Sequence, residues 1–314
     1  GAADHVQIDD VLALRGEVET RGAKNAATKM MIATLLTEEP CRLENFPRLG
    51  DTQITAELLG AIGSTIAHGS NGVTLATPRV TSSRVGGLSR KNRIPILALG
   101  PLLARTGVAE VPVLGGDSIG PRPVNFHIDA LSKMGAHIEI SDSIYRARTD
   151  GLRGTEITLP YPSVGATENV ILAAVLAKGK TIIRNAALEP ELIDLVKMLQ
   201  NMGAIIELGT ERKVAIEGVT RLHGVRHTIL PDRNEAVSFA TAAIATGGEV
   251  LVRGAVHEHL ITFLNTLSRI GASFRVEPEG IRFWRKQPLT AIEIQTDTQP
   301  GFMTDWQQPL AVLL

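Results

Sequence analysis

The stretch Asp129-Ala-Leu-Ser-Lys-Met-Gly135-Ala-His-Ile decides the fold, because three similar stretches occur elsewhere in the chain. Their equivalent glycines are Gly63, Gly203 and Gly271, so successive glycines lie 72, 68 and 68 residues apart. Self-similarity at an almost fixed spacing indicates one supersecondary unit that the chain uses several times. The prediction of the whole fold starts from this repeat.

Each copy of the repeat predicts the same order of elements. Apolar residues at i, i+3 and i+4 indicate an amphipathic helix that ends at the glycine, where a left-handed backbone conformation stops it. An alternating strand such as Ala136-His-Ile-Glu-Ile follows, and a turn leads to a second strand such as Gly72-Val-Thr-Leu-Ala. Upstream, a helix of small residues such as Asn169–Gly179 precedes a strand such as Thr181-Ile-Ile-Arg. The unit is βαβαββ and about 70 residues long.

Four copies are complete, and a fifth begins at Ala291-Ile-Glu-Ile and reaches its first helix at residues 310–314. A solenoid of stacked units is one interpretation of such a repeat. The small-residue helix is apolar on nearly all faces, however, and this favours burial in the middle of a closed domain. We therefore expect an α/β fold with that helix buried, in a chain that is unfinished at its C-terminus.

Composition and charge exclude several classes of protein. The formal net charge of −1 at pH 7 argues against broad binding to nucleic acid or to an anionic membrane. The single cysteine, Cys41, rules out an internal disulfide framework and a cysteine-based zinc cluster, and it fits a reducing compartment. No stretch reaches the roughly 18 uninterrupted apolar residues of a membrane span. We expect a cytoplasmic protein without a metal site, in which His257 and His259 form a polar surface pair.

Unusual polar residues gather at the expected start of each small-residue helix. They are Lys24-Asn25, Lys91-Asn92-Arg93, Ser163 to Glu168, Asp232-Arg233 and Thr304-Asp305. Helix starts expose unpaired N–H groups and a partial positive charge, so they suit phosphates and carboxylates. Capping explains Ser, Thr, Asp and Asn at these positions. It does not explain Lys24 or Arg93, because a cation there opposes the helix dipole; these two residues are candidates for binding an anion.

A second cluster is the run Leu114-Gly-Gly-Asp117-Ser-Ile-Gly-Pro-Arg122-Pro-Val-Asn-Phe-His127. Its three glycines allow the backbone to approach a ligand closely, and it also holds an acid, an arginine and a histidine. The glycine spacing matches neither the dinucleotide fingerprint nor a P-loop. Taken alone the run indicates a ligand-binding loop, and capping of a turn is the alternative explanation for Asp117.

As a complete string, this run resembles the catalytic loop of the enolpyruvyl transferase family, in the branch that acts on UDP-N-acetylglucosamine. Further motifs of that family follow in order: Gly22 to Asn25, Leu99 to Arg105, Ser163 to Asn169, Glu189 to Glu191, Pro231 to Arg233 and Pro300 to Gln307. The resemblance implies an inside-out α/β barrel of repeated βαβαββ units, with the active site in a cleft between two domains. Residues 22–230 would form the first domain, with three repeats. Residues 1–21 and 231–314 would form the second.

The resemblance also implies that the second domain is incomplete. It would hold one full repeat and part of another, while the rest of the fifth repeat and the whole sixth repeat are expected to be missing. The late arginines with which the family helps to hold phosphoenolpyruvate belong to that part. We also expect the N-terminal strand to lose the unit that it normally completes.

The activity implied is transfer of enolpyruvate from phosphoenolpyruvate to the 3′-hydroxyl of UDP-N-acetylglucosamine, with release of phosphate. This is the first committed step of peptidoglycan precursor synthesis, and it serves cell wall biogenesis, cell shape and cell division. The partners would be the two small-molecule substrates, with no cofactor, nucleic acid or membrane. The sister enzyme acting on shikimate 3-phosphate is disfavoured by the Gly-Gly-Asp-x-Ile-Gly-x-Arg-Pro loop. The alternative from another class is a non-catalytic homologue or fragment that binds a nucleotide-sugar or a protein partner.

The resemblance assigns roles residue by residue. The catalytic positions are Asp117 as proton donor, Asp305 as base near the sugar hydroxyl, and Lys24. The positions that bind phosphoenolpyruvate are Lys24, Arg93 and Arg122. The positions that bind UDP-N-acetylglucosamine are Asn25, Arg93, Arg122, Pro123, Val124, Asn125, Ser163, Val164, Gly165 and Asp305. For His127, ligand binding and a structural hydrogen bond are both open.

Two positions depart from the family. Asp117 stands where most members have a cysteine that is thought to protonate C3 of phosphoenolpyruvate. An aspartic acid can do so only if burial or neighbouring carboxylates raise its pKa from the ordinary value of about 3.9. We expect such a residue to resist alkylation by the epoxide antibiotic fosfomycin. Asn125 stands where aspartate is usual, which keeps hydrogen bonding to a uracil and removes a charge.

Overall fold

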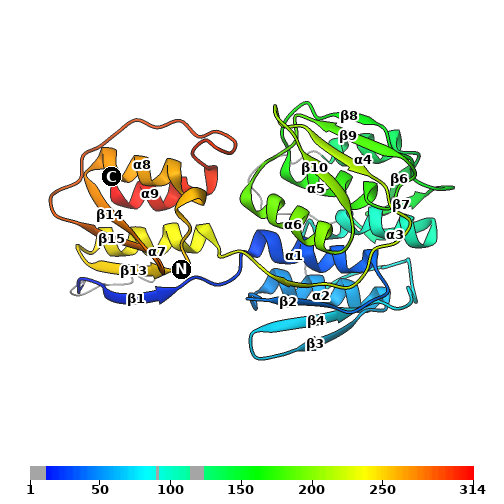
Figure 1. The fold of residues 1–314 in the computed structure, drawn as a ribbon, viewed down its shortest axis with the longest axis horizontal. Coiled ribbons are helices and arrows are strands. Elements are labelled where there is room, and N and C mark those ends of the chain that lie inside the picture. The colour runs from blue at the N-terminus through cyan, green and yellow to red at the C-terminus, as the bar shows by residue number, and fades with distance from the viewer. Residues whose placement is uncertain (1–11, 90–91, 114–123) are drawn as a thin grey trace, which may run out of the picture. The chain divides into compact units, whose positions relative to one another are not determined.

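The structure, a computed structural model, describes residues 12–89, 92–113 and 124–314. The chain divides into two compact units, which are Gly22–Leu230 and Gly1–Arg21 together with Pro231–Leu314 (Figure 1). Each unit is described by itself. Within the described ranges, no helix has both the length and the apolar character that crossing a membrane requires.

The unit Gly22–Leu230 contains three sheets, each accompanied by helices. The first has the order β12 (Arg226–Thr228), β2 (Cys41–Glu44), β4 (Gly72–Ala76), β3 (Thr65–His68), with α1 (Lys24–Ala33), η1 (Thr34–Leu36) and α2 (Gly50–Ile62). The second has the order β5 (Val108–Pro112), β7 (Ile144–Arg148), β6 (His137–Ser141), with η2 (Ile94–Ala98), α3 (Leu99–Thr106) and α4 (Asn125–Lys133). The third has the order β10 (Ile205–Leu208), β11 (Val214–Glu217), β9 (Lys180–Arg184), β8 (Glu156–Thr158), with α5 (Val164–Ala174) and α6 (Pro190–Asn201).

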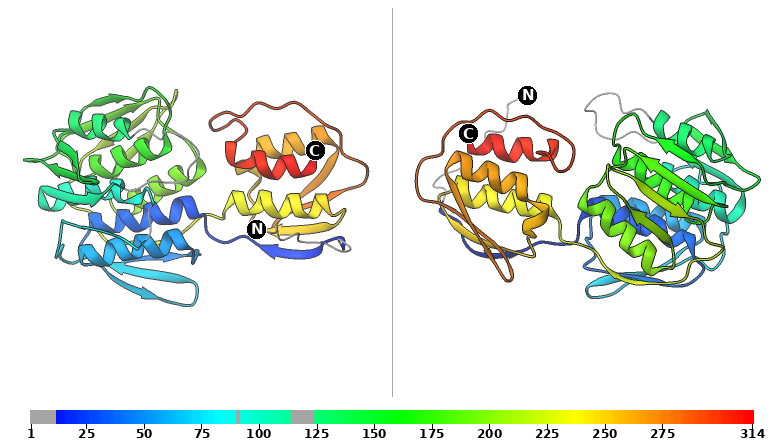
Figure 2. Two further views of the ribbon diagram at one scale, coloured as in Figure 1. Left: turned by 180° about the vertical axis from the view of Figure 1, so that it is seen from behind. Right: turned by 45° about the horizontal axis from the view of Figure 1, so that its top comes forward.

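The small-residue helices of this unit form its interior. All residues of α5 from Ala166 to Ala174 are buried, and so are most residues of α1. Figure 2 shows the strands on the outside of the unit and the helices between them. Alanine and glycine have little side chain to hold helices apart, so these helices pack closely in one core. The predicted burial of the small-residue helix is confirmed for α1 and α5.

The repeated glycines end their helices as the sequence predicts. Each has a positive φ: 119° at Gly63, 96° at Gly135, 101° at Gly203 and 89° at Gly271. A left-handed backbone is strained for any residue with a Cβ, so glycine is the residue that allows the chain to turn here into the next strand.

A second recurring feature is a backbone hydrogen bond to the residue that precedes each of these glycines. The carbonyl just before the glycine accepts the N–H of the segment that follows the hairpin, at 2.9 Å in every copy. The pairs are Thr81 to Ile62, Arg153 to Met134, His223 to Met202 and Thr290 to Ile270. The structural repeat therefore extends through the fourth copy of the sequence repeat.

The other unit is built around one sheet, with the order β1 (Arg15–Glu19), β13 (Glu249–Arg253), β15 (Gly280–Arg285), β14 (Ala272–Glu277). Its helical elements are α7 (Arg233–Ala245), η3 (His257–His259), α8 (Ile261–Ile270), η4 (Thr304–Trp306) and α9 (Gln307–Leu313). Trp306 is the centre of its core: the ring centroids of Phe263 and Phe302 lie 5.8 and 5.5 Å away. Both contacts are edge-on, the arrangement that aromatic pairs prefer.

Two expectations about this unit are wrong. The N-terminal strand does not lose its partner: β1 pairs in parallel with β13 through the whole register from Arg15 and Glu249 to Glu19 and Arg253. The unit that β1 completes is therefore the fourth repeat, which is present in the chain. The run Ala291–Ile294 forms no strand, because no neighbouring strand of the described chain supplies its hydrogen bonds.

Candidate functional site

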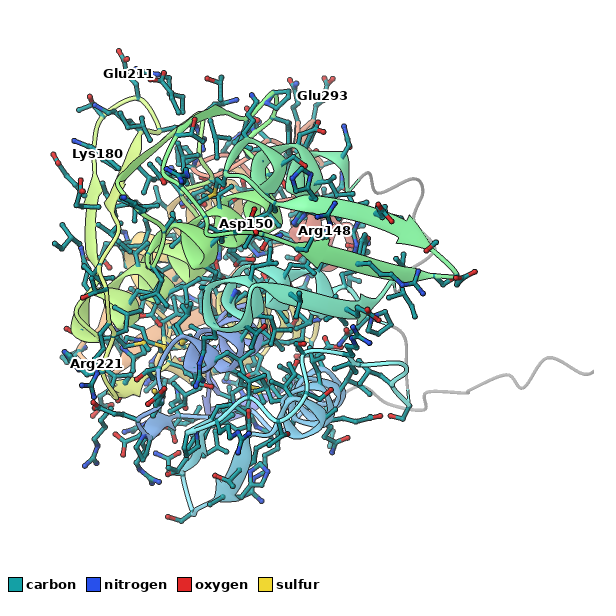
Figure 3. The ribbon with its side chains drawn as sticks, turned by 90° about the vertical axis from the view of Figure 1, so that its right-hand side faces the viewer. Arg148, Asp150, Lys180, Glu211, Arg221 and Glu293 are labelled. Carbon is teal, nitrogen blue, oxygen red and sulfur yellow. The ribbon has the colours of Figure 1, made fainter. Side chains whose placement is uncertain are left out.

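Three of the predicted site residues fall outside the described residues. They are Asp117, Arg122 and Pro123. The candidate residues that the structure describes in the unit Gly22–Leu230 lie at or beside helix starts. They are thus set apart from the charged side chains of the sheets and their connections, such as Arg148, Lys180 and Glu211, which Figure 3 labels.

Lys24 is the first residue of α1, and Asn25 is the second. The helix has no side-chain cap, and Lys24 Nζ lies 3.3 Å from Asp51 Oδ2, with both side chains about half exposed. The acid of Asp51 offsets the unfavourable placement of a cation at a helix start. Because an exposed ion pair contributes little to stability, Lys24 can exchange Asp51 for a ligand anion at little cost.

The start of α5 carries Ser163, Val164 and Gly165. Ser163 is the N-cap, and its hydroxyl accepts a hydrogen bond from the Ala166 N–H at 3.3 Å. Capping is therefore confirmed for this residue. No described residue accepts the N–H of Val164 or Gly165. These two amides and the positive end of the helix dipole make this turn suitable for a phosphate.

The start of α4 faces that of α5 through His127. Val124 is the N-cap of α4, and Asn125 is its first residue. Nδ2 of Asn169, which lies one turn after Gly165 on α5, is 3.1 Å from His127 Nδ1 and donates to the Ile96 carbonyl of η2 at 3.4 Å. The described nucleotide-binding candidates of α4 and α5 are thus joined by one histidine and one asparagine. The structural hydrogen bond that was one interpretation of His127 is present.

Arg93 lies beside the same histidine, at the N-cap of η2. Burial and, to a smaller extent, the positive charge of Arg93 together lower the pKa of His127 from 6.5 to about 4. The imidazole is therefore neutral at neutral pH. Arg93 supplies the permanent positive charge of this part of the site, and His127 supplies a neutral polar group.

Glu168, also on α5, is a buried acid to which the sequence analysis assigns no role of its own. Its side chain is 1% exposed, and its Oε2 atom has no hydrogen-bond partner in the described part of the chain. Burial, which is the largest cause, and the charges of Glu189 and Glu191 raise its pKa against the opposing charge of Lys29, from 4.5 to about 7 in all. An ionised carboxylate is costly in such surroundings. Glu168 therefore holds a proton up to about neutral pH.

We expect Glu168→Gln to raise the melting temperature by roughly 5–10 °C at pH 8 and to change it little at pH 5. The folded-state pKa of Glu168 lies above the unfolded value, so its contribution to stability is complete below pH 4.5 and is lost as the pH rises through about 7. The shift corresponds to about 3 kcal/mol at pH 8. Thermal unfolding at both pH values measures the effect, with Glu207→Gln at an exposed position of β10 as control. Equal effects at pH 5 and pH 8 would contradict the prediction.

Asp305 lies in the other unit, in η4. Its Oδ2 accepts a hydrogen bond from Asn234 Nδ2 at 3.4 Å, and Asn234 Oδ1 accepts the indole N–H of Trp306 at 2.9 Å. Asn234 is held in turn by its backbone N–H, which donates to the N-cap Asp232 at 2.8 Å. The capping interpretation is thus confirmed for Asp232. The start of α7 orients the carboxylate of Asp305.

Arg233 completes this cluster without facing solvent. It is 3% exposed, its guanidinium lies 5.6 Å from the centroid of the Trp306 ring, and it donates to Gln299 Oε1 at 3.1 Å. A guanidinium over an indole face is a favourable cation–π contact. Arg233 therefore fixes Trp306 and, next to it in sequence, Asp305.

Asn169 and Asn234 are the residues that sequence reasoning missed. Asn169 contacts His127, which lies 42 positions before it, and Asn234 contacts Asp305, which lies 71 positions after it. Asn169 is the last residue of the motif Ser163–Asn169, and Asn234 directly follows the motif Pro231–Arg233. Their positions in the first two turns of a helix indicate a possible role in the site, but the sequence does not identify the side chains that they contact.

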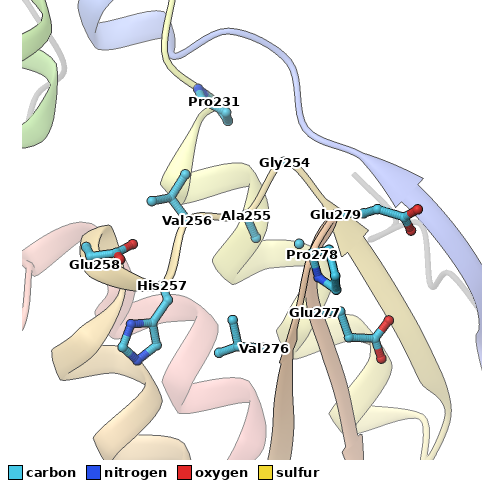
Figure 4. Close-up of a pocket in the computed structure, with 11 residues that line it drawn as sticks. Pro231, Gly254, Ala255, Val256, His257, Glu258, Val276, Glu277, Pro278 and Glu279 are labelled. Carbon is cyan, nitrogen blue, oxygen red and sulfur yellow. The ribbon is translucent and has the colours of Figure 1, made fainter.

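A pocket of about 670 Å³ in the same unit contains none of the predicted residues. Figure 4 shows it between the turn joining β14 to β15 and the segment before η3, with the acids Glu258, Glu277 and Glu279 on its lining. Three carboxylates repel a phosphate or a carboxylate ligand. No group of three or more His, Cys, Asp or Glu side chains in the described ranges could hold a metal ion.

Comparison with known proteins first gives the class of this chain. Residues 8–314 match the family described as EPSP synthase (3-phosphoshikimate 1-carboxyvinyltransferase). Among solved structures, the enolpyruvyl transferase NikO from Streptomyces tendae covers 96% of this chain and 73% of its own, with a TM-score of 0.85 at 21% identity. An EPSP synthase from Acinetobacter baumannii covers 95% and 69%, with a TM-score of 0.69 at 19% identity. The chain therefore belongs to the EPSP synthase family of enolpyruvyl transferases, and it has the fold of that family.

More similar in sequence are proteins named UDP-N-acetylglucosamine 1-carboxyvinyltransferase. The one from Chlamydia pneumoniae is 49% identical over 96% of this chain and 67% of its own length. The one from Zymomonas mobilis is 43% identical over 99% of this chain and 75% of its own length. These relatives favour the nucleotide-sugar branch over the shikimate branch. These comparisons do not support the expectation of missing repeats.

Proposed function

We propose that this chain transfers enolpyruvate from phosphoenolpyruvate to the 3′-hydroxyl of UDP-N-acetylglucosamine and releases phosphate. The observation that carries the proposal is the identity of 42–49% to transferases of that name over nearly the whole chain. The function would place the chain at the first committed step of peptidoglycan precursor synthesis, in the cytoplasm. Cell wall biogenesis, cell shape and cell division would depend on it.

Both substrates carry negative charges, which cationic side chains and the N–H groups at helix starts can bind. We assign phosphoenolpyruvate to Lys24, Arg93 and Arg122, because a substrate with a phosphate and a carboxylate needs charge-assisted hydrogen bonds. We assign the nucleotide-sugar to the starts of α4 and α5, with Asn25, Arg93, Arg122 and Asp305 as further contacts. The N–H groups of Val164 and Gly165, which no described residue accepts, support the placement of a diphosphate at the start of α5.

The chemistry is an addition followed by an elimination. In the addition, a bond forms between the sugar 3′-oxygen and C2 of phosphoenolpyruvate while a proton adds to C3. Asp305 takes the hydroxyl proton as general base, and Asp117 gives the proton to C3. In the elimination, the bond between C2 and the phosphate oxygen breaks and C3 returns a proton to the carboxylate of Asp117, which restores the double bond and the acid. The proton that Asp305 took leaves with the phosphate. Lys24 stabilises the negative charge that grows on the phosphate as it leaves.

The test is a phosphate-release assay on the purified chain with phosphoenolpyruvate and UDP-N-acetylglucosamine. We expect release of phosphate only when both substrates are present, together with a product heavier by one enolpyruvyl group. Release with shikimate 3-phosphate instead would assign the chain to the sister branch. Binding of UDP-N-acetylglucosamine without turnover would support the non-catalytic alternative and contradict the proposal.

A further inference from the structure

The contact between His127 and the start of α5 is closer than a structural hydrogen bond requires. A Cβ placed on Gly165 would lie 3.2 Å from His127 Cε1 and 3.4 Å from Nε2. The imidazole therefore lies directly against the turn whose amides at Val164 and Gly165 have no described acceptor. Gly165 and Asn169 are four positions apart on α5, so both lie on the helix face that meets the ring.

The hydrogen-bond geometry fixes which nitrogen of His127 carries the proton. Asn169 is fully buried, and its Nδ2 serves the Ile96 carbonyl, which can only accept. The amide is oriented by that carbonyl, so the same Nδ2 donates to His127 Nδ1. Because burial and Arg93 keep the ring neutral, its proton must be on Nε2. No described residue accepts this Nε2–H.

Asn169 also carries a cost that a purely structural residue would avoid. Its Oδ1 atom is buried without a hydrogen-bond partner in the described part of the chain. An unpaired buried acceptor destabilises a fold, so an atom of this kind needs an explanation. Orientation of His127 gives one, since a flipped amide would point Oδ1 at Nδ1 and move the imidazole proton.

We propose that His127 is a binding residue for the diphosphate of the nucleotide-sugar: it donates Nε2–H to a diphosphate oxygen held at the start of α5, and Asn169 is the positioning residue that sets its tautomer. The inference rests on the proposed function, which brings a nucleoside diphosphate to this turn. Gly165 has a specific place in it, because a Cβ there would lie only 3.2 Å from the ring and crowd it.

The decisive experiment separates the two nitrogens of His127. His127→Asn keeps an acceptor near Nδ1 for Asn169 but has no donor at the Nε2 position. His127→Gln places an amide N–H near the Nε2 position but loses the bond to Asn169. His137→Asn, at an exposed position of β6, is the matched control. Binding of UDP and of uridine to each variant is measured by calorimetry or NMR titration, and folding is checked by thermal unfolding.

We expect His127→Asn to weaken UDP binding by about 10- to 100-fold, as loss of one hydrogen bond to a charged acceptor predicts. His127→Gln should lose less, and the control nothing. Uridine lacks the diphosphate, so its affinity should be equal in all four proteins. Unchanged UDP binding by His127→Asn, or an equal loss for uridine and UDP, would overturn the assignment.

A spectroscopic measurement on the unmodified chain covers the case in which a variant does not fold. In protein with ¹⁵N-labelled histidine, we expect one imidazole with an unprotonated Nδ1 and a protonated Nε2 that keeps this state down to about pH 5. Its Nε2–H resonance should move when UDP is added and stay in place when uridine is added. A proton on Nδ1 would overturn the proposal while leaving the transferase function intact. Absence of UDP binding to the wild type would overturn both.

Discussion

Asp305→Asn is expected to lower kcat in the phosphate-release assay by about 100- to 10,000-fold, the range that removal of a general base produces. Asparagine has the shape of aspartate and can still accept the hydrogen bond from Asn234, so the cluster around Trp306 should persist. It cannot take the proton of the sugar hydroxyl at neutral pH. The loss should therefore fall on kcat, with the KM values of both substrates changed by less than about threefold.

The control for this experiment is Glu293→Gln, which neutralises an exposed carboxylate of the same unit (Figure 3). It should keep full activity and the same melting temperature. If Asp305→Asn retained activity within about threefold of the wild type, another group would have to be the base. If it lost activity together with its melting temperature, the carboxylate would be structural.

The second large effect concerns Asp117 and fosfomycin. The wild-type chain is expected to show no time-dependent inactivation by this epoxide, whereas Asp117→Cys should be inactivated completely and gain the mass of one inhibitor molecule. A thiolate opens the epoxide by forming a C–S bond, and a carboxylate is a much weaker nucleophile toward it. Intact-mass spectrometry and residual activity over time measure both results.

The cysteine content of the chain allows an adduct to be assigned to one residue. Cys41 is the chain's one cysteine, it is fully buried in β2, and burial raises its pKa to about 11. A thiol in that state is inert, so an adduct in the variant can be assigned to residue 117. Asp117→Ser, which offers a hydroxyl of similar size, is the control and should not be labelled. Labelling of Asp117 in the wild type would contradict the expected insensitivity.

The fold was largely readable from the sequence because its signals are local. A glycine with positive φ after an amphipathic helix leaves the same trace in every copy, and Gly63, Gly135, Gly203 and Gly271 were found by it. Burial of the small-residue helix follows from composition alone. Strand pairing is not local. β1 and β13 lie far apart along the chain, and the sequence of neither strand identifies the other as its partner.

The same distinction applies to the candidate site. Helix starts could be located, so Lys24, Ser163 and Asp305 were singled out with their polar neighbours. The side-chain contacts of these residues could not be predicted, because a pair such as His127 and Asn169 joins two helices and leaves no periodic pattern in the sequence. The run Ala291–Ile294 failed for a related reason: alternation makes a strand possible, but only a neighbour with free hydrogen-bonding groups makes it form.

The parallel pairing of β1 with β13 has a consequence for how the chain folds. The hydroxyl of Thr20 donates to the Arg253 carbonyl, 233 positions further on, so this unit must close a very long loop. The unit inserted in that loop holds its own ends together, since the Ala23 N–H donates to the Leu230 carbonyl at 2.8 Å. Once the insertion has folded, the effective loop is short, and closing it costs far less chain entropy. We therefore expect the continuous unit to fold first and the interrupted unit to fold after it.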